Sequence, residues 1–112
     1  MIIIDKDFNI KMTKGDTFLR SIVLKKGDKA YNPDPDDRIR FALSNVYKGE
    51  KGYNLLIEKI IPNDSLQWRI DPEDTNDLRY GSYVYDLQIT YADGKVETFA
   101  DKKRFVLTEE VE

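Results

Sequence analysis

"GSYVYDLQITYADGKVETF", residues 81–99, carries the pattern that decides the fold class. Tyrosine, leucine or isoleucine occupies every second position from 83 to 91, and mostly polar residues lie between them. This alternation is typical of a strand with one buried face. Asp93 and Gly94 then tolerate the positive φ of a tight turn, which predicts a hairpin whose return strand begins near Val96. The alternation breaks at residues 100–103, which predicts a bulge or bend.

Related patterns run through the rest of the chain and predict further strands at residues 8–14, 16–24, 38–46, 54–61 and 65–71. Trp68 falls on the inward face of the last of these. The strand at 54–61 carries apolar residues on both faces, so its register stays open. At the start of the strand near residue 83, a tyrosine is expected to bond back to nearby backbone, as sandwich domains often arrange.

Helical signals are confined to "DPEDTNDL", residues 71–78. Asp71 is a suitable N-cap, Pro72 suits the first turn, and Asp74 is placed where a carboxylate meets free backbone amides. One short helical turn near 72–78 is expected. Together with the strands, this predicts an all-β protein, an antiparallel immunoglobulin-like β-sandwich of about 6–8 strands, as a single domain over residues 1–112.

Composition narrows the function classes. The 112 residues include no cysteine and no histidine, and the net charge is −3 with 18 basic and 21 acidic residues intermixed. Neither a nucleic acid nor a membrane surface is the expected partner, because both usually require a basic face. The N-terminus lacks the long apolar core of a signal peptide, so synthesis and folding in the cytoplasm are expected. The scattered glycines form no phosphate-binding pattern, and no cofactor is expected.

Two clusters of acidic residues each suggest a chemical function, but a structural explanation is simpler in both cases. The loop at residues 31–37 offers carboxylates for calcium, from Asp34, Asp36 and Asp37. It lacks the order of ligands that a calcium loop needs, and its prolines favour a stiff surface connector. A second cluster, Asp71, Glu73 and Asp74, would suit a small hydrolase. Helix capping accounts for Asp71 and Asp74, and no serine has a histidine partner, so a non-enzymatic protein is expected.

Two tyrosines in the loop at residues 46–53, Tyr47 and Tyr53, are the candidate interface residues. Exposed loop tyrosines present large contact areas with few rotatable bonds to order. The alternative is that they fold back over the edge of the sandwich. Tyr47, Tyr53 and Trp68 also support a second hypothesis, a small ligand-binding module of the carbohydrate-binding kind, although the inward position of Trp68 counts against it.

Three stretches resemble the small β-sandwich modules of tailed-phage structural proteins: "MTKGDTFLRSIVL" at 12–24, "PEDTNDLRYGSYVYDLQITYADGKVETF" at 72–99 and "KRFVLTEEV" at 103–111. The resemblance is to the N-terminal domains of baseplate upper proteins and related prophage tail proteins, and spans roughly residues 10–111. Its shared marks are residues 15–17, the Gly81, Tyr83, Tyr85 and Asp86 set, and the turn at 93–94.

The resemblance implies a non-enzymatic assembly role with no catalytic residues. The implied partners are other tail or baseplate proteins or further copies of the chain, as a homo-oligomer. The implied location is the virion, after synthesis in the host bacterial cytoplasm. Baseplate upper proteins continue into helical and receptor-directed parts, whereas this sequence stops at Glu112. A free-standing adaptor or accessory tail protein is therefore expected rather than a host-receptor binder, and the alternative is a fragment of a longer tail protein.

Overall fold

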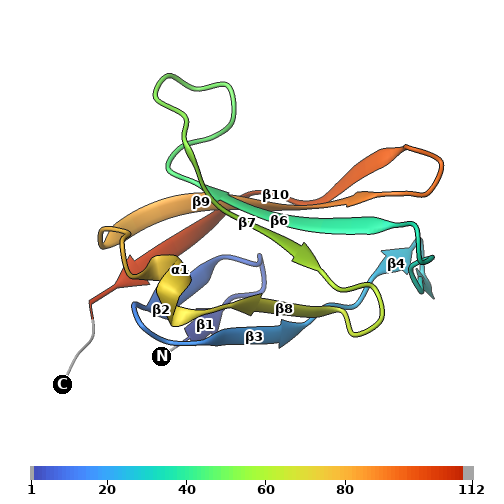
Figure 1. Ribbon diagram of the computed structural model, residues 1–112, viewed down its shortest axis with the longest axis horizontal. Helices are drawn as coiled ribbons and strands as arrows, with labels where there is room; N and C mark the ends of the chain where they lie inside the picture. Colours follow the sequence, from blue (N-terminus) through green and yellow to red (C-terminus); the bar gives the residue numbers. More distant parts are fainter. Residues whose placement is uncertain (1, 110–112) are drawn as a thin grey trace.

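The computed structural model describes residues 2–109, which form a mostly β structure in two layers (Figure 1). Its elements are β1 (Ile2–Ile4), β2 (Ile10–Thr13), β3 (Phe18–Ser21), β4 (Lys25–Lys26), β5 (Lys29–Ala30), β6 (Arg38–Ser44), β7 (Leu55–Ile61), β8 (Gln67–Ile70), α1 (Pro72–Thr75), β9 (Gly81–Thr90) and β10 (Val96–Thr108). The all-β prediction is confirmed. The end of the region that carries the resemblance, residues 110 and 111, lies outside the described residues, as does Glu112.

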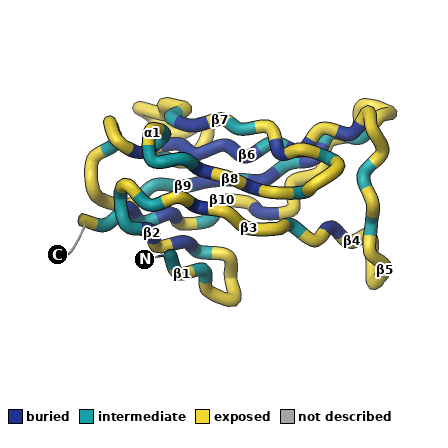
Figure 2. The backbone as a smooth tube through the Cα atoms, turned by 60° about the horizontal axis from the view of Figure 1, so that its bottom comes forward, coloured by how far each residue is buried: buried dark blue, intermediate teal, exposed yellow. Residues whose placement is uncertain are grey.

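One layer is a six-stranded sheet in the order β1-β2-β10-β9-β6-β7, and the other is the two-stranded sheet β3-β8. The predicted hairpin is β9–β10, and its turn contains Gly94 at φ 91°. The predicted bulge is also present, because the register of β10 against β9 shifts between Thr98 and Ala100 and again between Ala100 and Lys103. A two-residue hairpin, β4–β5, forms an arm at one end of the molecule (Figure 2).

The expectation of a wholly antiparallel sheet is wrong at one pair of strands. β2 lies parallel to β10, with Ile10 opposite Phe105 and Met12 opposite Leu107. After β2 the chain crosses to β3 in the other layer. The last strand, β10, joins the large sheet beside β2 and runs in the same direction. Side-chain alternation indicates which face is buried but carries no information on the direction of a neighbour. Residues 2–109 contain ten strands rather than 6–8. The additional strands β1, β4 and β5 are very short, too short to show a pattern in the sequence.

An aromatic cluster joins the two layers. The ring of Trp68, on β8, has its centroid 4.6 Å from Phe18 on β3, 5.0 Å from Phe41 on β6 and 5.5 Å from Tyr85 on β9. All four residues are at most 4% exposed. Offset and edge-on ring pairs at such distances add to the free energy gained by burying apolar area. Figure 2 shows the buried segments gathered on the strands that face the opposite layer.

The structure settles the register of β7, which the sequence left open. Ile57 and Ile61 are buried, whereas Ile60 is 55% exposed. Lys59 shares the inward face and places its Nζ 2.9 Å from the carboxylate of Asp74 in α1. The charged Lys59 can therefore lie at this inward position, where an apolar side chain would be usual, because it pairs with Asp74 of the helix.

The predicted helical turn is present as α1, which ends at Thr75 rather than near residue 78. The backbone N–H of Asp71 donates to the carboxylate of Asp74 at 2.8 Å, within a capping box. The expected tyrosine contact is present as well: the Tyr83 hydroxyl donates to the carbonyl of Arg79 at 2.5 Å. These contacts fix the approach of the chain to β9.

Candidate functional site

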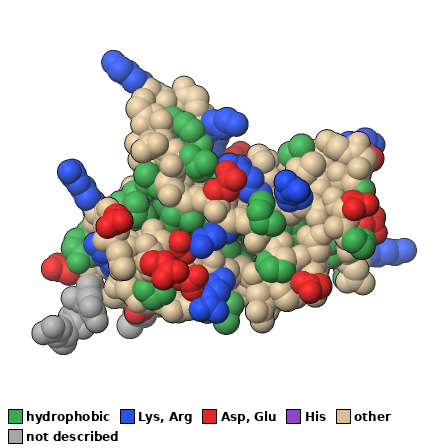
Figure 3. Space-filling view, in the orientation of Figure 1, with side chains coloured by type: hydrophobic (Ala, Val, Ile, Leu, Met, Phe, Trp, Pro, Cys, Tyr) green, Lys and Arg blue, Asp and Glu red, His purple; other side chains and the backbone are tan. Residues whose placement is uncertain are grey.

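The loop between β6 and β7, residues 45–54, stands out from the large sheet (Figure 1). Its base is closed by Asn45, whose side-chain amide donates to the carbonyl of Gly52 at 2.8 Å and whose side-chain oxygen accepts from the N–H of Asn54 at 2.7 Å. Within the loop, the N–H of Glu50 donates to the carbonyl of Tyr47 at 3.0 Å. The loop is therefore held in one shape by its own hydrogen bonds. Figure 3 shows hydrophobic side chains on its flank and basic side chains around it.

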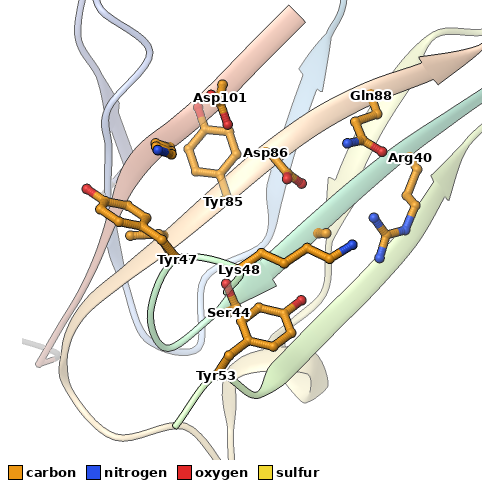
Figure 4. A pocket seen from close by; sticks show the side chains of 12 residues that line it. Arg40, Ser44, Tyr47, Lys48, Tyr53, Tyr85, Asp86, Gln88 and Asp101 are labelled. Atoms are coloured by element: carbon orange, nitrogen blue, oxygen red, sulfur yellow. The ribbon is translucent and has the colours of Figure 1, made fainter. Parts of the chain in front are cut away.

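A cavity of about 250 Å³ lies between this loop and the outer face of the large sheet, the face turned away from β3 and β8 (Figure 4). The loop contributes Tyr47, Lys48 and Tyr53 to its wall. The sheet contributes side chains from alternate positions of β6 and β9 and from the β10 bulge, among them Arg40, Ser44, Asp86, Gln88, Asp101 and Lys102. The structure thus brings the two sequence-predicted tyrosines to one site. Both are partly exposed, Tyr47 at 38% and Tyr53 at 37%.

Asp86 is the electrostatic centre of this cavity. Its Oδ1 is buried and has no hydrogen-bond partner within residues 2–109. Burial raises the pKa of the Asp86 carboxyl, and Asp101 raises it further, while Arg40 and Lys48 act in the opposite direction. Arg40 is itself paired with Glu58 at 2.7 Å on the neighbouring strand. A buried carboxylate oxygen without a partner is costly for folding and ready to accept a hydrogen bond.

The bulge in β10 shapes the opposite wall. Lys102 adopts a positive φ of 52°, and its Nζ lies 5.6 Å from the centroid of the Tyr47 ring. The backbone irregularity thus turns a basic side chain toward the aromatic part of the cavity. Bulges commonly redirect side chains in this way beside functional sites.

Trp68 does not belong to this site. It is 4% exposed and lies between the two layers, so the hypothesis that it serves as a ligand-stacking platform is wrong. Sequence patterns did not identify Arg40, Asp86 and Gln88 as cavity residues. The alternation of polar and apolar residues along the strands predicted that these side chains face solvent. The loop at residues 45–54, which is distant in sequence, makes this solvent-facing side of the sheet concave.

The acidic cluster near α1 is occupied by structural contacts. Asp74 accepts from the Asp71 N–H and pairs with Lys59, while the Asp71 carboxylate accepts from Arg69 Nε at 2.5 Å. These two carboxylates support the helix and its approach strands.

The loop at residues 31–37 is a surface connector except at its end, where Asp37 is 4% exposed. Its carboxylate accepts from the Tyr31 hydroxyl and, at 2.9 Å each, from the N–H groups of Asp34 and Ala92. The interpretation of the whole loop as a plain connector is therefore wrong for Asp37, which ties it to the β9–β10 turn. Within residues 2–109 no group of three or more acidic, histidine or cysteine side chains is arranged to hold a metal ion.

A second surface lies where the small sheet is too short to cover the inner face of the large one. A groove of about 590 Å³ runs there, and its apolar lining includes Phe8, Val23, Leu24, Ile89, Tyr91 and Phe99. Phe8 is 58% exposed, Val23 75% and Phe99 38%. The groove borders residues 96–103 of β10, a stretch that pairs with β9 on one side and has no strand on the other within the described chain, since β2 reaches only residues 105–108.

No protein-family model matches this sequence, and no curated protein or solved structure matches it. In the part of the chain that the structure describes, no helix is long and apolar enough to cross a membrane.

Proposed function

We propose that this protein is a non-enzymatic structural module or assembly adaptor of a tailed-phage or prophage particle, acting in the tail or baseplate through protein–protein contacts. It is made in the cytoplasm of the bacterial host and joins the virion. The resemblance at residues 12–24, 72–99 and 103–111 supports this proposal. The two-layer packing and the tyrosine contact at the start of β9 support an immunoglobulin-like sandwich as its fold.

The observation that carries the proposal is the open edge of β10 beside the apolar groove. At the turn, the N–H of Tyr91 donates to the carbonyl of Lys95 at 2.8 Å. Hydrogen-bonded and non-hydrogen-bonded pairs alternate along an antiparallel ladder, so Val96 and Thr98 direct their backbone groups to the outer side. An added strand from a partner would satisfy these groups, as in other cases of strand addition.

Part of the β10 edge is protected against pairing with a further strand. The bulge and the charged run at residues 101–104 discourage pairing along the middle of β10, as proteins commonly do at sheet edges. Residues 96–99 precede the charged run and carry one charged side chain, Glu97, and Val96 is 60% exposed. In Figure 1 this end of the hairpin projects beyond the rest of the sheet. A partner strand would therefore dock at residues 96–99 and cover the groove with its inward side chains.

The chemistry of the chain supports a role without catalysis. The sequence has no histidine or cysteine to serve as base or nucleophile. The carboxylates of Asp71 and Asp74 are engaged in capping and ion pairs.

The test is incorporation into particles. The gene is replaced in its phage-producing strain by variants, and particles are separated from free protein on a density gradient. Thr98→Pro removes an outward N–H, whereas Thr98→Ala removes the same side-chain hydroxyl and keeps that N–H. We expect the native chain and Thr98→Ala in the particle fraction and Thr98→Pro in the free fraction. A native chain found only as free protein would contradict the particle role, and incorporation of Thr98→Pro would contradict the edge.

Light scattering over a range of protein concentrations identifies the partner class. A discrete oligomer that Thr98→Pro dissolves would show that copies of the chain pair through β10. A monomer at every concentration, together with incorporation into particles, would show that the edge receives a different tail protein.

A further inference from the structure

The cavity under the loop at residues 45–54 is not used by the open edge of β10, and its charge balance indicates what it can hold. Three basic side chains, Arg40, Lys48 and Lys102, and two acidic ones, Asp86 and Asp101, line it. A cationic ligand would meet the three basic groups, and Lys102 already lies over the ring of Tyr47. An anionic ligand would meet two carboxylates, one of them partly buried. An apolar ligand would leave the Asp86 oxygen buried without a partner.

We propose that this cavity binds a neutral, hydroxyl-rich ligand, a single sugar ring of a saccharide, between the aromatic rings of Tyr47 and Tyr53 and the polar floor formed by Arg40, Asp86 and Gln88. Each hydroxyl group both donates and accepts a hydrogen bond, so a sugar can satisfy acids and bases in the same small space. This site lies on the outer face of the sheet, away from the groove, and extends the protein's function beyond assembly.

The roles of the side chains follow from their atoms. The Asp86 carboxylate, which lines the cavity, accepts from a ligand hydroxyl, a charge-assisted bond that is stronger than a neutral one. Arg40, held against Glu58 on the sheet, and Lys48, from the loop, donate to other hydroxyls of the ligand. Figure 4 shows Tyr47 and Tyr53 on the loop side of the cavity and Arg40, Asp86 and Gln88 on the sheet strands. The tyrosine rings offer faces against which the C–H side of a sugar can pack.

The cavity is formed before any ligand arrives. The Asn45 hydrogen bonds hold the base of the loop, and the strand pairing of β6 with β9 fixes the floor. At about 250 Å³ it is smaller than the pockets that take drug-sized ligands, which measure roughly 300–1,000 Å³. One ring with hydroxyl substituents fits that size. For so few ligand atoms, a dissociation constant on the order of 1 mM is expected.

The experiment is a titration of the purified, isotopically labelled chain with single monosaccharides, glucose, galactose, mannose, rhamnose and N-acetylglucosamine, followed by amide chemical shifts in NMR spectra. We expect saturable shifts with at least one sugar, confined to the cavity residues. Tyr53→Ala and Asp86→Asn should each weaken binding by about tenfold or more, since the first removes the ring and the second replaces a charge-assisted hydrogen bond by a neutral one. Tyr53→Phe keeps the ring and should bind more tightly than Tyr53→Ala.

Tyr80→Ala is the matched control, because Tyr80 is 52% exposed and lies outside the cavity. Its affinity should equal that of the native chain, and the spectra of all variants show whether the fold is retained. No saturable shifts with any of these sugars at concentrations tenfold above the expected constant would overturn the proposal. Saturable shifts at the cavity with argininamide or inorganic phosphate, and none with a sugar, would also overturn it. Neither result bears on the incorporation of Thr98 variants into particles.

Discussion

Truncation of Trp68 is expected to be the most damaging single change in the interior, because this ring joins the two layers. Trp68 is 4% exposed and contacts three aromatic rings whose centroids lie 4.6–5.5 Å away. Trp68→Ala should cost about 3–5 kcal/mol, the range measured for large-to-small changes at buried aromatic sites. Domains of this size have a total stability of about 5–15 kcal/mol. The melting temperature should therefore fall by roughly 12–20 °C.

Trp68→Phe should cost much less than its size suggests. The indole Nε1–H is buried without a hydrogen-bond partner in the described chain, so the native protein bears the penalty of an unsatisfied donor. Replacing the indole by a phenyl ring removes that donor, a gain of about 1–3 kcal/mol that offsets much of the lost packing. We expect a net cost within about 1.5 kcal/mol, against about 3–5 kcal/mol for Trp68→Ala.

Urea denaturation followed by circular dichroism measures both variants on the same scale, because it does not depend on the tryptophan signal. The slope of the transition should stay constant, which licenses the comparison of midpoints. In the native protein, fluorescence of the single Trp68 should be blue-shifted and move to longer wavelength on unfolding. If Trp68→Phe proves as costly as Trp68→Ala, the indole N–H is satisfied in solution and the reasoning from its unpaired state is wrong.

Three further changes and one control test the polar contacts. Asp86→Asn should stabilise the protein near neutral pH, because burial raises the pKa of this carboxyl and its ionised form therefore destabilises the fold. This gain in stability should vanish as the pH falls below the ordinary pKa of 3.8. An equal gain in acid would contradict this explanation. Asp37→Asn should destabilise the protein, since the Tyr31 hydroxyl and then the backbone N–H groups lower the pKa of Asp37. The stabilisation by the ionised Asp37 is present above pH 3.8 and is lost as the pH falls through the lowered pKa. The urea midpoints of variant and native protein should therefore converge in acid. Tyr83→Phe removes the hydroxyl that donates to Arg79 and should cost about 1 kcal/mol in thermal melts, whereas Tyr47→Phe should be neutral.

Much of the fold follows from local patterns in the sequence. A strand with one buried face must alternate, so the positions of Phe41, Trp68 and Tyr85 in the core were predictable from spacing alone. The register of β7 was not, because apolar residues occupy both of its faces. Its inward face includes Lys59, which pairs with Asp74, a contact between two elements that no local pattern contains.

The candidate site was predictable only in part, for a similar reason. Tyr47 and Tyr53 stand out because large aromatic residues are uncommon in a glycine-containing, charged loop. Asp86 looks like an ordinary solvent-facing residue of an alternating strand. Its carboxylate loses water only because the loop and the β10 bulge come together over it, an arrangement that depends on three separate parts of the chain.

The parallel pairing of β2 with β10 has a consequence for how the molecule is made. The two strands join residues about 95 positions apart, so β2 lacks its inner neighbour until β10 has left the ribosome. Until then, Ile10 and Met12 have only β1 beside them, and the apolar edge of β2 is open to other nascent chains. Contacts of such long sequence separation also slow folding. Completion of the large sheet therefore waits for the synthesis of β10, and conditions that delay this step should increase aggregation at β2.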